Sequence, residues 1–178
     1  HVVVVSMPGY GFSGPTRERG IDVAKVAAAV ADVMAQLGYD RFVAQGGDWG
    51  SIISTQVALH DPGHVAGLHL NMCFGNAPAG TDPNEGLTDA ERERVKARQL
   101  FQSEETGYQQ IQGTKPQTIG IALNDSPVGL AAWIVEKFRT WCDCDGHPET
   151  IFSRHDLLAN ITLYWATQTA ASSTRIYY

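Results

Sequence analysis

A five-residue run in the first third of the chain has the pattern of a nucleophile turn. Gly46-Gly47-Asp48-Trp49-Gly50 follows a short apolar segment and precedes a helix-like one, the context of the G-x-nucleophile-x-G turn. We expect its glycines to be needed because the backbone crosses itself closely there. A carboxylate needs no base to become nucleophilic at neutral pH, and it can displace at a saturated carbon to leave an alkyl ester. The pattern therefore predicts Asp48 as an attacking group.

Two features of this turn would support such chemistry. The amino end of the following helix favours a charged Asp48, and the backbone N–H of Trp49 can stabilise the oxyanion that forms when the ester is hydrolysed. The alternative is a plain turn in which Asp48 caps the helix, because aspartate is a favoured cap. The preceding strand and the upstream loop Pro8-Gly9-Tyr10-Gly11-Phe12-Ser13 favour the nucleophile.

The segments around the turn alternate between strand and helix patterns. Strands are expected at residues 2–5, 41–45 and 65–72, and helices at residues 23–37 and 49–60. The run Val2–Val5 is unbroken and β-branched, which is typical of a strand buried on both faces of a parallel sheet. Gly38 stands where a helix C-cap is expected. Together these segments predict two βαβ units.

The composition changes after residue 74. Residues 75–84 are rich in Gly, Pro and Asn, and the remainder has helical patterns with more charge. We therefore expect one domain at residues 1–74, and a linker and helical domain at residues 75–178. Helix starts are predicted at Thr88 with Glu91, at Ser126 before Pro127, and at Ser153 with Asp156, with ends near Phe101, Trp141 and Thr169.

Composition and charge exclude several classes of partner. The formal net charge is −6, and no cluster of Lys and Arg is present, so no nucleic acid partner is expected and a small molecule is favoured.

The three cysteines fit reduced thiols, and the spacing of Cys142 and Cys144 is only a weak indication of a metal site. No apolar run of transmembrane length is seen, so membrane association is not evident and a cytoplasmic location is expected. The chain starts at His1 and stops in mid-pattern, which indicates a fragment.

The residues Gly-Gly-Asp-Trp-Gly-Ser at positions 46–51 form a nucleophile elbow in the pattern described above. This sequence resembles the epoxide hydrolases of the α/β-hydrolase fold, in the microsomal-type branch with its bacterial and fungal relatives. The similarity continues through residues 107–118, 122–134, 136–138, 163–165 and 172–177. The resemblance implies an α/β fold with a partial α/β-hydrolase parallel sheet and an inserted, mainly helical cap domain. Residues 1–74 would be the partial core with the elbow, and residues 75–178 the linker and cap.

The resemblance also implies a reaction and a set of site residues. Asp48 would open an epoxide to an alkyl-enzyme ester, which is then hydrolysed to a vicinal diol, and two cap tyrosines that hold the epoxide oxygen match Tyr108 and Tyr177. A small apolar epoxide and water are the expected partners, with no cofactor and no metal, and a homo-oligomer is compatible with the sequence. The residues expected to line the substrate pocket are Phe12, Trp49, Trp133 and Trp165.

The family's second step uses a His oriented by an acidic residue, both located after the cap. We expect none of His60, His64, His69, His147 and His155 to be this base. The upstream His-Gly-x-Pro loop, which supplies the other oxyanion donor, is not found either. We therefore expect the isolated chain to show no multiple-turnover diol formation, although Asp48 can still be alkylated.

Two other functions fit parts of the pattern. A haloalkane dehalogenase has a similar Asp-Trp elbow but holds its leaving halide with indole N–H groups, so Tyr108 and Tyr177 favour an epoxide over a halide. A catalytically inactive, α/β-hydrolase-like binding module for small molecules is the other alternative, because no base for the second step is found.

Overall fold

The computed structural model describes residues 1–73, 75 and 78–178. The chain divides into two compact units. We call Val23–Gln110 the strand unit, and His1–Asp22 together with Ile111–Tyr178 the helical unit. The predicted domain boundary falls between residues 74 and 75. Residue 74 lies outside the described residues, and the boundary stays a prediction.

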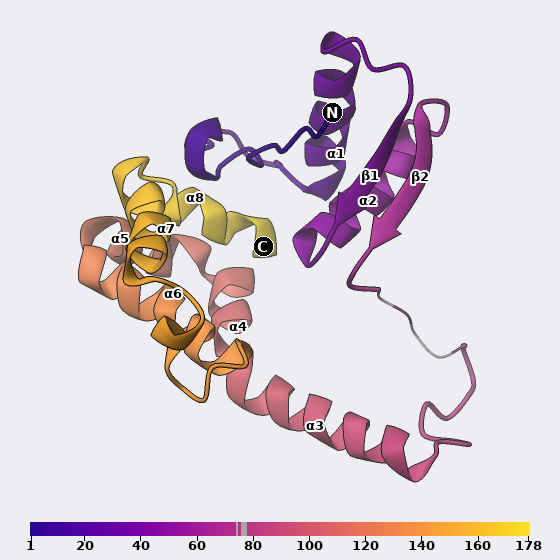
Figure 1. Ribbon diagram of the computed structural model, residues 1–178, viewed down its shortest axis with the longest axis vertical. Helices are drawn as coiled ribbons and strands as arrows, with labels where there is room; N and C mark the ends of the chain where they lie inside the picture. Colours follow the sequence, from indigo (N-terminus) through magenta and orange to yellow (C-terminus); the bar gives the residue numbers. More distant parts are fainter. Residues whose placement is uncertain (74, 76–77) are drawn as a thin grey trace. The chain divides into compact units, whose positions relative to one another are not determined.

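The strand unit contains a parallel βαβ arrangement. Its elements are α1 (Val23–Gln36), β1 (Phe42–Gly46), α2 (Trp49–His60), β2 (Val65–Leu70) and α3 (Asp89–Glu105), and the division between the units passes through α4 (Gly107–Thr114). The crossover helix α2 packs against both parallel strands, and α1 packs against α2 (Figure 1). This arrangement confirms the predicted crossover from the second expected strand to the third.

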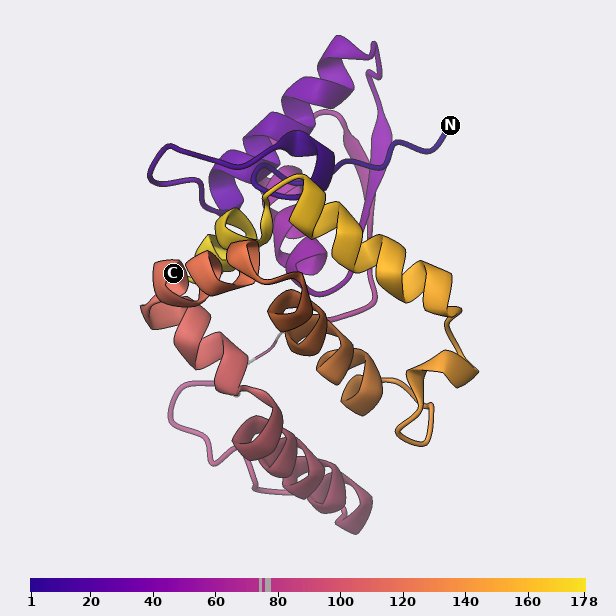
Figure 2. The same ribbon diagram turned by 90° about the vertical axis from the view of Figure 1, so that its left-hand side faces the viewer.

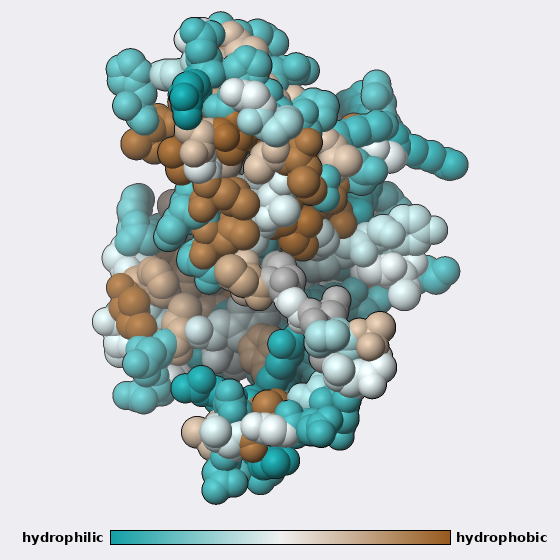
Figure 3. Space-filling model, turned by 90° about the vertical axis from the view of Figure 1, so that its right-hand side faces the viewer, coloured by the Kyte–Doolittle hydropathy of each residue, from teal (hydrophilic) through white to brown (hydrophobic). Residues whose placement is uncertain are grey.

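Apolar surface remains on the sheet of the strand unit. Parallel sheets are normally covered on both faces. Here Val43 in β1 is 65% exposed and Leu68 in β2 is 42% exposed. Figure 3 shows apolar side chains gathered over these strands. The described residues therefore cover this sheet only in part.

The predicted strand at residues 2–5 is wrong. Val2–Val5 has no regular secondary structure and is not part of the β1–β2 sheet, and Val2 and Val4 are 90% and 88% exposed. A strand exists through its hydrogen bonds to a neighbour, which β-branched composition alone does not supply. Of the two predicted βαβ units, the first therefore lacks its opening strand in the part of the chain that the structure describes.

Helix α1 ends at a glycine, as predicted. Gly38 has a φ of 80°, which a residue without a side chain adopts easily. The N–H of Tyr39 donates to the carbonyl of Met34 and the N–H of Gly38 to that of Ala35, both at 3.0 Å. These two bonds form a Schellman motif, which satisfies the last carbonyls of the helix and turns the chain toward β1.

The helical unit is built around one apolar cluster. Its elements are η1 (Gly11–Ser13), α5 (Pro116–Asp125), α6 (Pro127–Trp141), η2 (Pro148–Thr150), α7 (Arg154–Ala166), α8 (Ala170–Ser173) and η3 (Thr174–Tyr177). Helix α5 packs against α6 and α8, and α6 packs against α7 (Figure 2). The buried members of the cluster are Leu123, Leu130, Ile161 and Ala170. Each of the helices α5, α6, α7 and α8 contributes one of these residues, so the cluster joins the four helices.

Side-chain caps start three helices at the predicted positions. The capping residues are Thr88 of α3, in a reciprocal box with Glu91, Ser126 of α6 and Ser153 of α7. Helix α6 also ends at Trp141 as predicted, whereas α3 extends to Glu105. The helix starts were therefore more predictable than the ends, because short polar side chains that accept backbone N–H bonds mark them.

Helix α7 ends at Ala166, before the predicted end at Thr169. Gln168 adopts a φ of 56°, and the N–H of Thr169 donates to the carbonyl of Tyr164 at 3.0 Å. This is a helix-ending turn of the kind that glycine usually makes. A glutamine in that position does not indicate a helix end in the sequence. The predicted end at Thr169 is therefore wrong, because the helix ends at Ala166.

Within the described residues, no single helix combines the length and apolar composition needed to cross a membrane, and only α5 with α6, bent by 115° at their junction, meets that test as a pair.

We expect Ser126→Ala to lower the free energy of unfolding by about 1 kcal/mol, because α6 loses the hydroxyl that accepts the Gly129 N–H bond at 3.0 Å. Chemical denaturation measures the change. Ser103→Ala is the matched control, since its exposed hydroxyl bonds the carbonyl of Leu100 within the same helix, and its effect should stay within about 0.5 kcal/mol. Equal losses in the two variants would contradict a capping role for Ser126.

Candidate active site

Asp48 lies in the turn between β1 and α2 with a backbone conformation that is rare for a residue with a side chain. Its φ is 51° and its ψ is −128°. This combination falls outside the left-handed helical region that Asp and Asn tolerate. The residue is exposed beyond the carboxyl end of β1. Strained residues of this kind cluster at functional sites, so the turn has the backbone that a nucleophile elbow requires.

The hydrogen bond of the Asp48 side chain also differs from that of an ordinary cap. Ordinary caps have an extended backbone and accept a bond from the second or third residue of the helix. Thr88, Ser126 and Ser153 all follow this rule. Asp48 instead accepts a bond through Oδ1 from the N–H of Trp49, the first residue of α2, at 2.7 Å. The geometry therefore argues against the plain capping alternative.

Two of the three glycines of the turn are required by close contacts. A Cβ on Gly46 would lie 2.0 Å from the carbonyl oxygen of Gly50, and one on Gly47 would lie 2.4 Å from Oδ1 of Asn71. A Cβ on Gly50 would meet no described atom within 4 Å. The expectation that every glycine of the run must lack a side chain is therefore wrong for Gly50, which only contributes its carbonyl to the crossing.

Backbone and hydroxyl bonds hold the elbow from both sides. The buried Ser51 donates its hydroxyl to the carbonyl of Gly46 at 3.1 Å, and its N–H to the carbonyl of Asp48 at 3.0 Å. The N–H of Asn71 donates to the same Gly46 carbonyl at 3.3 Å and extends the ladder beyond β2. The strained conformation of Asp48 is thus fixed by both the helix and the sheet.

The two predicted tyrosines lie on short helices of different units. Tyr108 is in the first turn of α4 and belongs to the strand unit with Asp48, and its phenol oxygen accepts a bond from Nε2 of Gln109 at 2.9 Å. Tyr177 is half-buried in η3 of the helical unit. Its neighbour Tyr178 is 85% exposed. The roles of both tyrosines stay predictions.

The predicted aromatic pocket residues have different surroundings. Trp49 is half-buried at the start of α2, and Phe12 is 86% exposed in η1. Trp133 packs on the apolar cluster of the helical unit and donates Nε1–H to Oε1 of the buried Gln112 at 3.3 Å. Trp165 is 40% exposed near the end of α7. Asp48 and Trp49 are joined by the bond from the Trp49 N–H to Oδ1 of Asp48, and the pocket assignment stays a prediction.

A His–Asp pair lies in the strand unit, but far from the elbow. Nδ1 of His64 lies 2.5 Å from Oδ1 of Asp61. The hydrogen bond to Asp61, together with the charge of that carboxylate, raises the pKa of His64 above its ordinary value. The pair precedes β2, whereas the elbow follows β1. Because the strands are parallel, these are opposite ends of the sheet, separated by roughly 17 Å of strand.

The second of the two cysteines that follow α6 is hydrogen-bonded to the last turns of that helix. Cys144 is buried, and its thiol donates to the carbonyls of Phe138 and Arg139 at 3.7 and 3.5 Å. Among the described residues, no three His, Cys, Asp or Glu side chains gather in a way that could hold a metal ion.

Sequence reasoning missed a cluster of buried hydroxyls in the helical unit. Thr169, Ser172 and Thr174 are all buried and hydrogen-bonded. The resemblance covers the run Ser172-Ser173-Thr174-Arg175 but implies nothing about the partners of its hydroxyls. Its one signal was the gathering of small polar residues in an otherwise apolar stretch, which does not reveal the partners.

Comparisons with known proteins agree with this geometry. A family model for the alpha/beta hydrolase fold matches residues 1–118, more than half of the chain. Epoxide hydrolase 1 of Oryctolagus cuniculus is 41% identical over 198 aligned residues, which cover 99% of this chain and 43% of that protein.

Two solved structures are also similar. Juvenile hormone epoxide hydrolase from the silkworm Bombyx mori matches with a TM-score of 0.86 at 37% identity, over 97% of this chain and 45% of that one. The epoxide hydrolase of Aspergillus niger matches with a TM-score of 0.83 at 32% identity, over 97% and 43% of the two chains. The chain spans less than half the length of these relatives.

The chain belongs to the α/β-hydrolase fold family. Within that family it is homologous to epoxide hydrolases, as the elbow and the later motifs predicted. The predicted fold class is confirmed as a partial α/β-hydrolase fold, with two parallel strands and a mostly helical remainder.

We expect Gly46→Ala to destabilise the chain by about 3 kcal/mol or more, because its Cβ would overlap backbone that cannot move without disrupting α2. Gly50→Ala is the matched control. It adds the same methyl group to the other end of the crossing, where space is open, and should change stability by no more than about 1 kcal/mol. Denaturant titration compares the two, and similar losses would show that the crossing is looser than described.

Proposed function

We propose that this chain carries the nucleophile of an epoxide hydrolase and that Asp48 forms the covalent intermediate. The asymmetry of the Asp48 carboxylate is the observation that supports this most. Oδ1 is held by the Trp49 N–H at 2.7 Å, whereas Oδ2 accepts no hydrogen bond from the described residues. Homology to epoxide hydrolases supports the choice of substrate class.

In the first step, Oδ2 attacks one carbon of the three-membered ring. A bond forms between that carbon and Oδ2, and the bond from the same carbon to the ring oxygen breaks. The electron pair passes to the ring oxygen, which takes a proton from a phenol and becomes a hydroxyl. The product is a 2-hydroxyalkyl ester of Asp48.

Tyr108 and Tyr177 are proposed to supply hydrogen bonds and this proton. A phenol stabilises the departing oxygen without protonating the ring prematurely, and two donors share the developing charge. The bond from Gln109 Nε2 to the Tyr108 oxygen, at 2.9 Å, supports this role. It places an amide donor on the oxygen that becomes more negative as the phenol gives up its proton.

In the second step, water attacks the carbonyl carbon of the ester. The charge that develops falls on Oδ1, which the Trp49 N–H already contacts. The bond from this carbon to Oδ2 then breaks, Oδ2 leaves as the second hydroxyl oxygen of the diol, and the oxygen of the water completes the restored carboxylate. One proton of the water ends on that hydroxyl and the other returns to the phenolate left by the first step. A base must take a proton from the water. We do not assign this base to His64, because its pair with Asp61 lies at the opposite end of the sheet.

The proposed substrate is a small apolar epoxide. Trp49, Phe12, Trp133 and Trp165 offer aromatic surface to the carbon skeleton of such a molecule. A haloalkane is less well supported, since a halide departs without a proton and gains less from two phenols than an alkoxide does.

Asp48→Asn should abolish ester formation, because a neutral amide is a poor nucleophile. Incubation with styrene oxide followed by rapid acid quench should add the mass of one epoxide to the unsubstituted protein, and peptide mapping should locate it on Asp48. Asp40→Asn is the control, since Asp40 precedes β1 at the other end of the strand, and it should label normally. Labelling that persists in Asp48→Asn would refute the assignment.

Tyr108→Phe and Tyr177→Phe should each slow ester formation about 100-fold, because one donor to the leaving oxygen is lost. Single-turnover labelling with styrene oxide in the full-length protein measures the rate. The control is Tyr178→Phe, which removes the adjacent, 85% exposed phenol and should leave the rate unchanged. If Tyr178→Phe were slow and Tyr177→Phe normal, the role would belong to Tyr178.

A further inference from the structure

A short polar segment of the helical unit, Thr169–Arg175, precedes Tyr177 and is unusually well tied to its surroundings. Thr169, Ser172 and Thr174 in this segment are 0%, 5% and 2% exposed. A hydroxyl buried without a partner destabilises the fold. Throughout the described part of the chain, no buried side-chain nitrogen or oxygen lacks a hydrogen bond. The position of the segment is therefore set by where its partners lie.

One group of partners belongs to the loop around η1. Each bond pairs a side-chain hydroxyl with a backbone group. The hydroxyl belongs to the segment in two of the bonds and to the loop in the third. They are Ser172 Oγ to the Gly9 carbonyl at 2.5 Å, the Gly11 N–H to Thr169 Oγ1 at 3.2 Å, and the Tyr10 hydroxyl to the Ser173 carbonyl at 2.8 Å. Three bonds within five residues leave the segment little freedom to slide along this loop.

The other partners lie on α5. Thr174 donates its hydroxyl to the carbonyl of Pro116 at 3.2 Å, and the N–H of Ala171 donates to Oδ1 of Asn124 at 3.0 Å. Between them, a Cβ on Gly120 would lie 2.8 Å from Cα of Ala171. The backbone of α8 thus rests directly on α5 at a glycine, and the two hydrogen bonds fix its register there.

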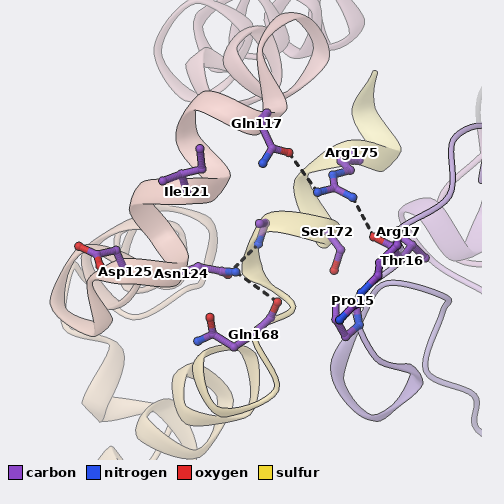
Figure 4. Close-up of a pocket in the computed structure, with 11 residues that line it drawn as sticks. Pro15, Thr16, Arg17, Gln117, Ile121, Asn124, Asp125, Gln168, Ser172 and Arg175 are labelled. Atoms are coloured by element: carbon purple, nitrogen blue, oxygen red, sulfur yellow. Dashed lines mark hydrogen bonds between the residues drawn. The ribbon is translucent and has the colours of Figure 1, made fainter.

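The side chain of Arg175 bonds both to the loop around η1 and to α5. Its Nη1 donates to the carbonyl of Thr16 at 2.8 Å, and its Nη2 donates to Oε1 of Gln117 at 3.0 Å. Figure 4 shows the guanidinium between the loop and α5. Arg175 is one of the residues that line a cavity of about 440 Å³. A guanidinium presents these donors in one rigid plane, which the single nitrogen of a lysine cannot do.

We propose that Arg175 is a positioning residue for Tyr177. Both residues belong to the four-residue helix η3, so the guanidinium fixes the start of the turn that presents the phenol. The carbonyl of Tyr177 would lie 3.3 Å from a Cβ on Gly113, which shows that α4 also approaches this turn closely. Arg175 acts through the phenol and not on the substrate. The inference rests on the proposed function, in which Tyr177 donates to the epoxide oxygen.

The test compares steady-state kinetics on styrene oxide in the full-length protein. Arg175→Lys keeps the charge but cannot hold both partners, and it should lower kcat about 10-fold to 100-fold with little change in KM, because a small displacement of a catalytic group is costly. Arg17→Lys is the matched control. It makes the same change on an exposed arginine of the same cavity and should leave kcat unchanged.

A double-variant cycle separates positioning from general damage. If Arg175 acts through the phenol, Arg175→Lys combined with Tyr177→Phe should be no slower than Tyr177→Phe alone. Multiplied losses would show a general structural role and overturn the inference. So would a normal kcat in Arg175→Lys beside a slow Tyr177→Phe, and that result would leave the proposed function intact. A normal kcat in Tyr177→Phe would instead remove the assigned role of Tyr177, and the inference with it.

Discussion

The close crossing of β1 and α2 at Gly46 is the constraint on which the candidate site depends. There the carbonyl of Gly50 occupies the space of a side chain, and Asp48 in the same turn adopts its unusual φ of 51°. A conformation of this kind costs about 1–3 kcal/mol. Burial of Ile53 and Val57 on α2 contributes about 1.5–3 kcal/mol for each side chain, which is enough to offset the strain. The packing of α2 against the strands is therefore what keeps the carboxylate exposed.

In the helical unit, hydrogen bonds set the exact positions of the elements. Its apolar cluster joins α5, α6, α7 and α8 but sets no fine register, since apolar contacts are not directional. The hydroxyls of Thr169, Ser172 and Thr174 supply direction, because each must meet a particular acceptor or donor. A typical buried hydrogen bond contributes only about 1 kcal/mol, whereas leaving one of these groups unpaired costs about 1–3 kcal/mol. Such a network adds little stability and strongly disfavours other arrangements of the turn that bears Tyr177.

A feature could be predicted from the sequence where residues close to it in the chain determine it. The elbow and the helix starts at Thr88, Ser126 and Ser153 were predictable because a few neighbouring residues determine them. Val2–Val5 was not, since a strand depends on a partner that its own residues do not encode. The end of α7 was missed because a glutamine occupies the position where a glycine would have signalled the turn. The bonds of Arg175 join residues 58 and 159 positions apart, a distance at which spacing in the sequence carries no information.

In the proposed mechanism, a single N–H serves every stage of the reaction. Oδ1 of Asp48 is one end of the resting carboxylate, then the carbonyl oxygen of the ester, and then the oxyanion. It keeps its place beside the Trp49 N–H throughout, so no group has to reorganise as charge returns to this atom. A serine in the same position would start with a single oxygen, which attacks, and the oxyanion would form on the substrate. The strained elbow therefore suits an aspartate for a physical reason, since it fixes one oxygen to the helix and leaves the other to react.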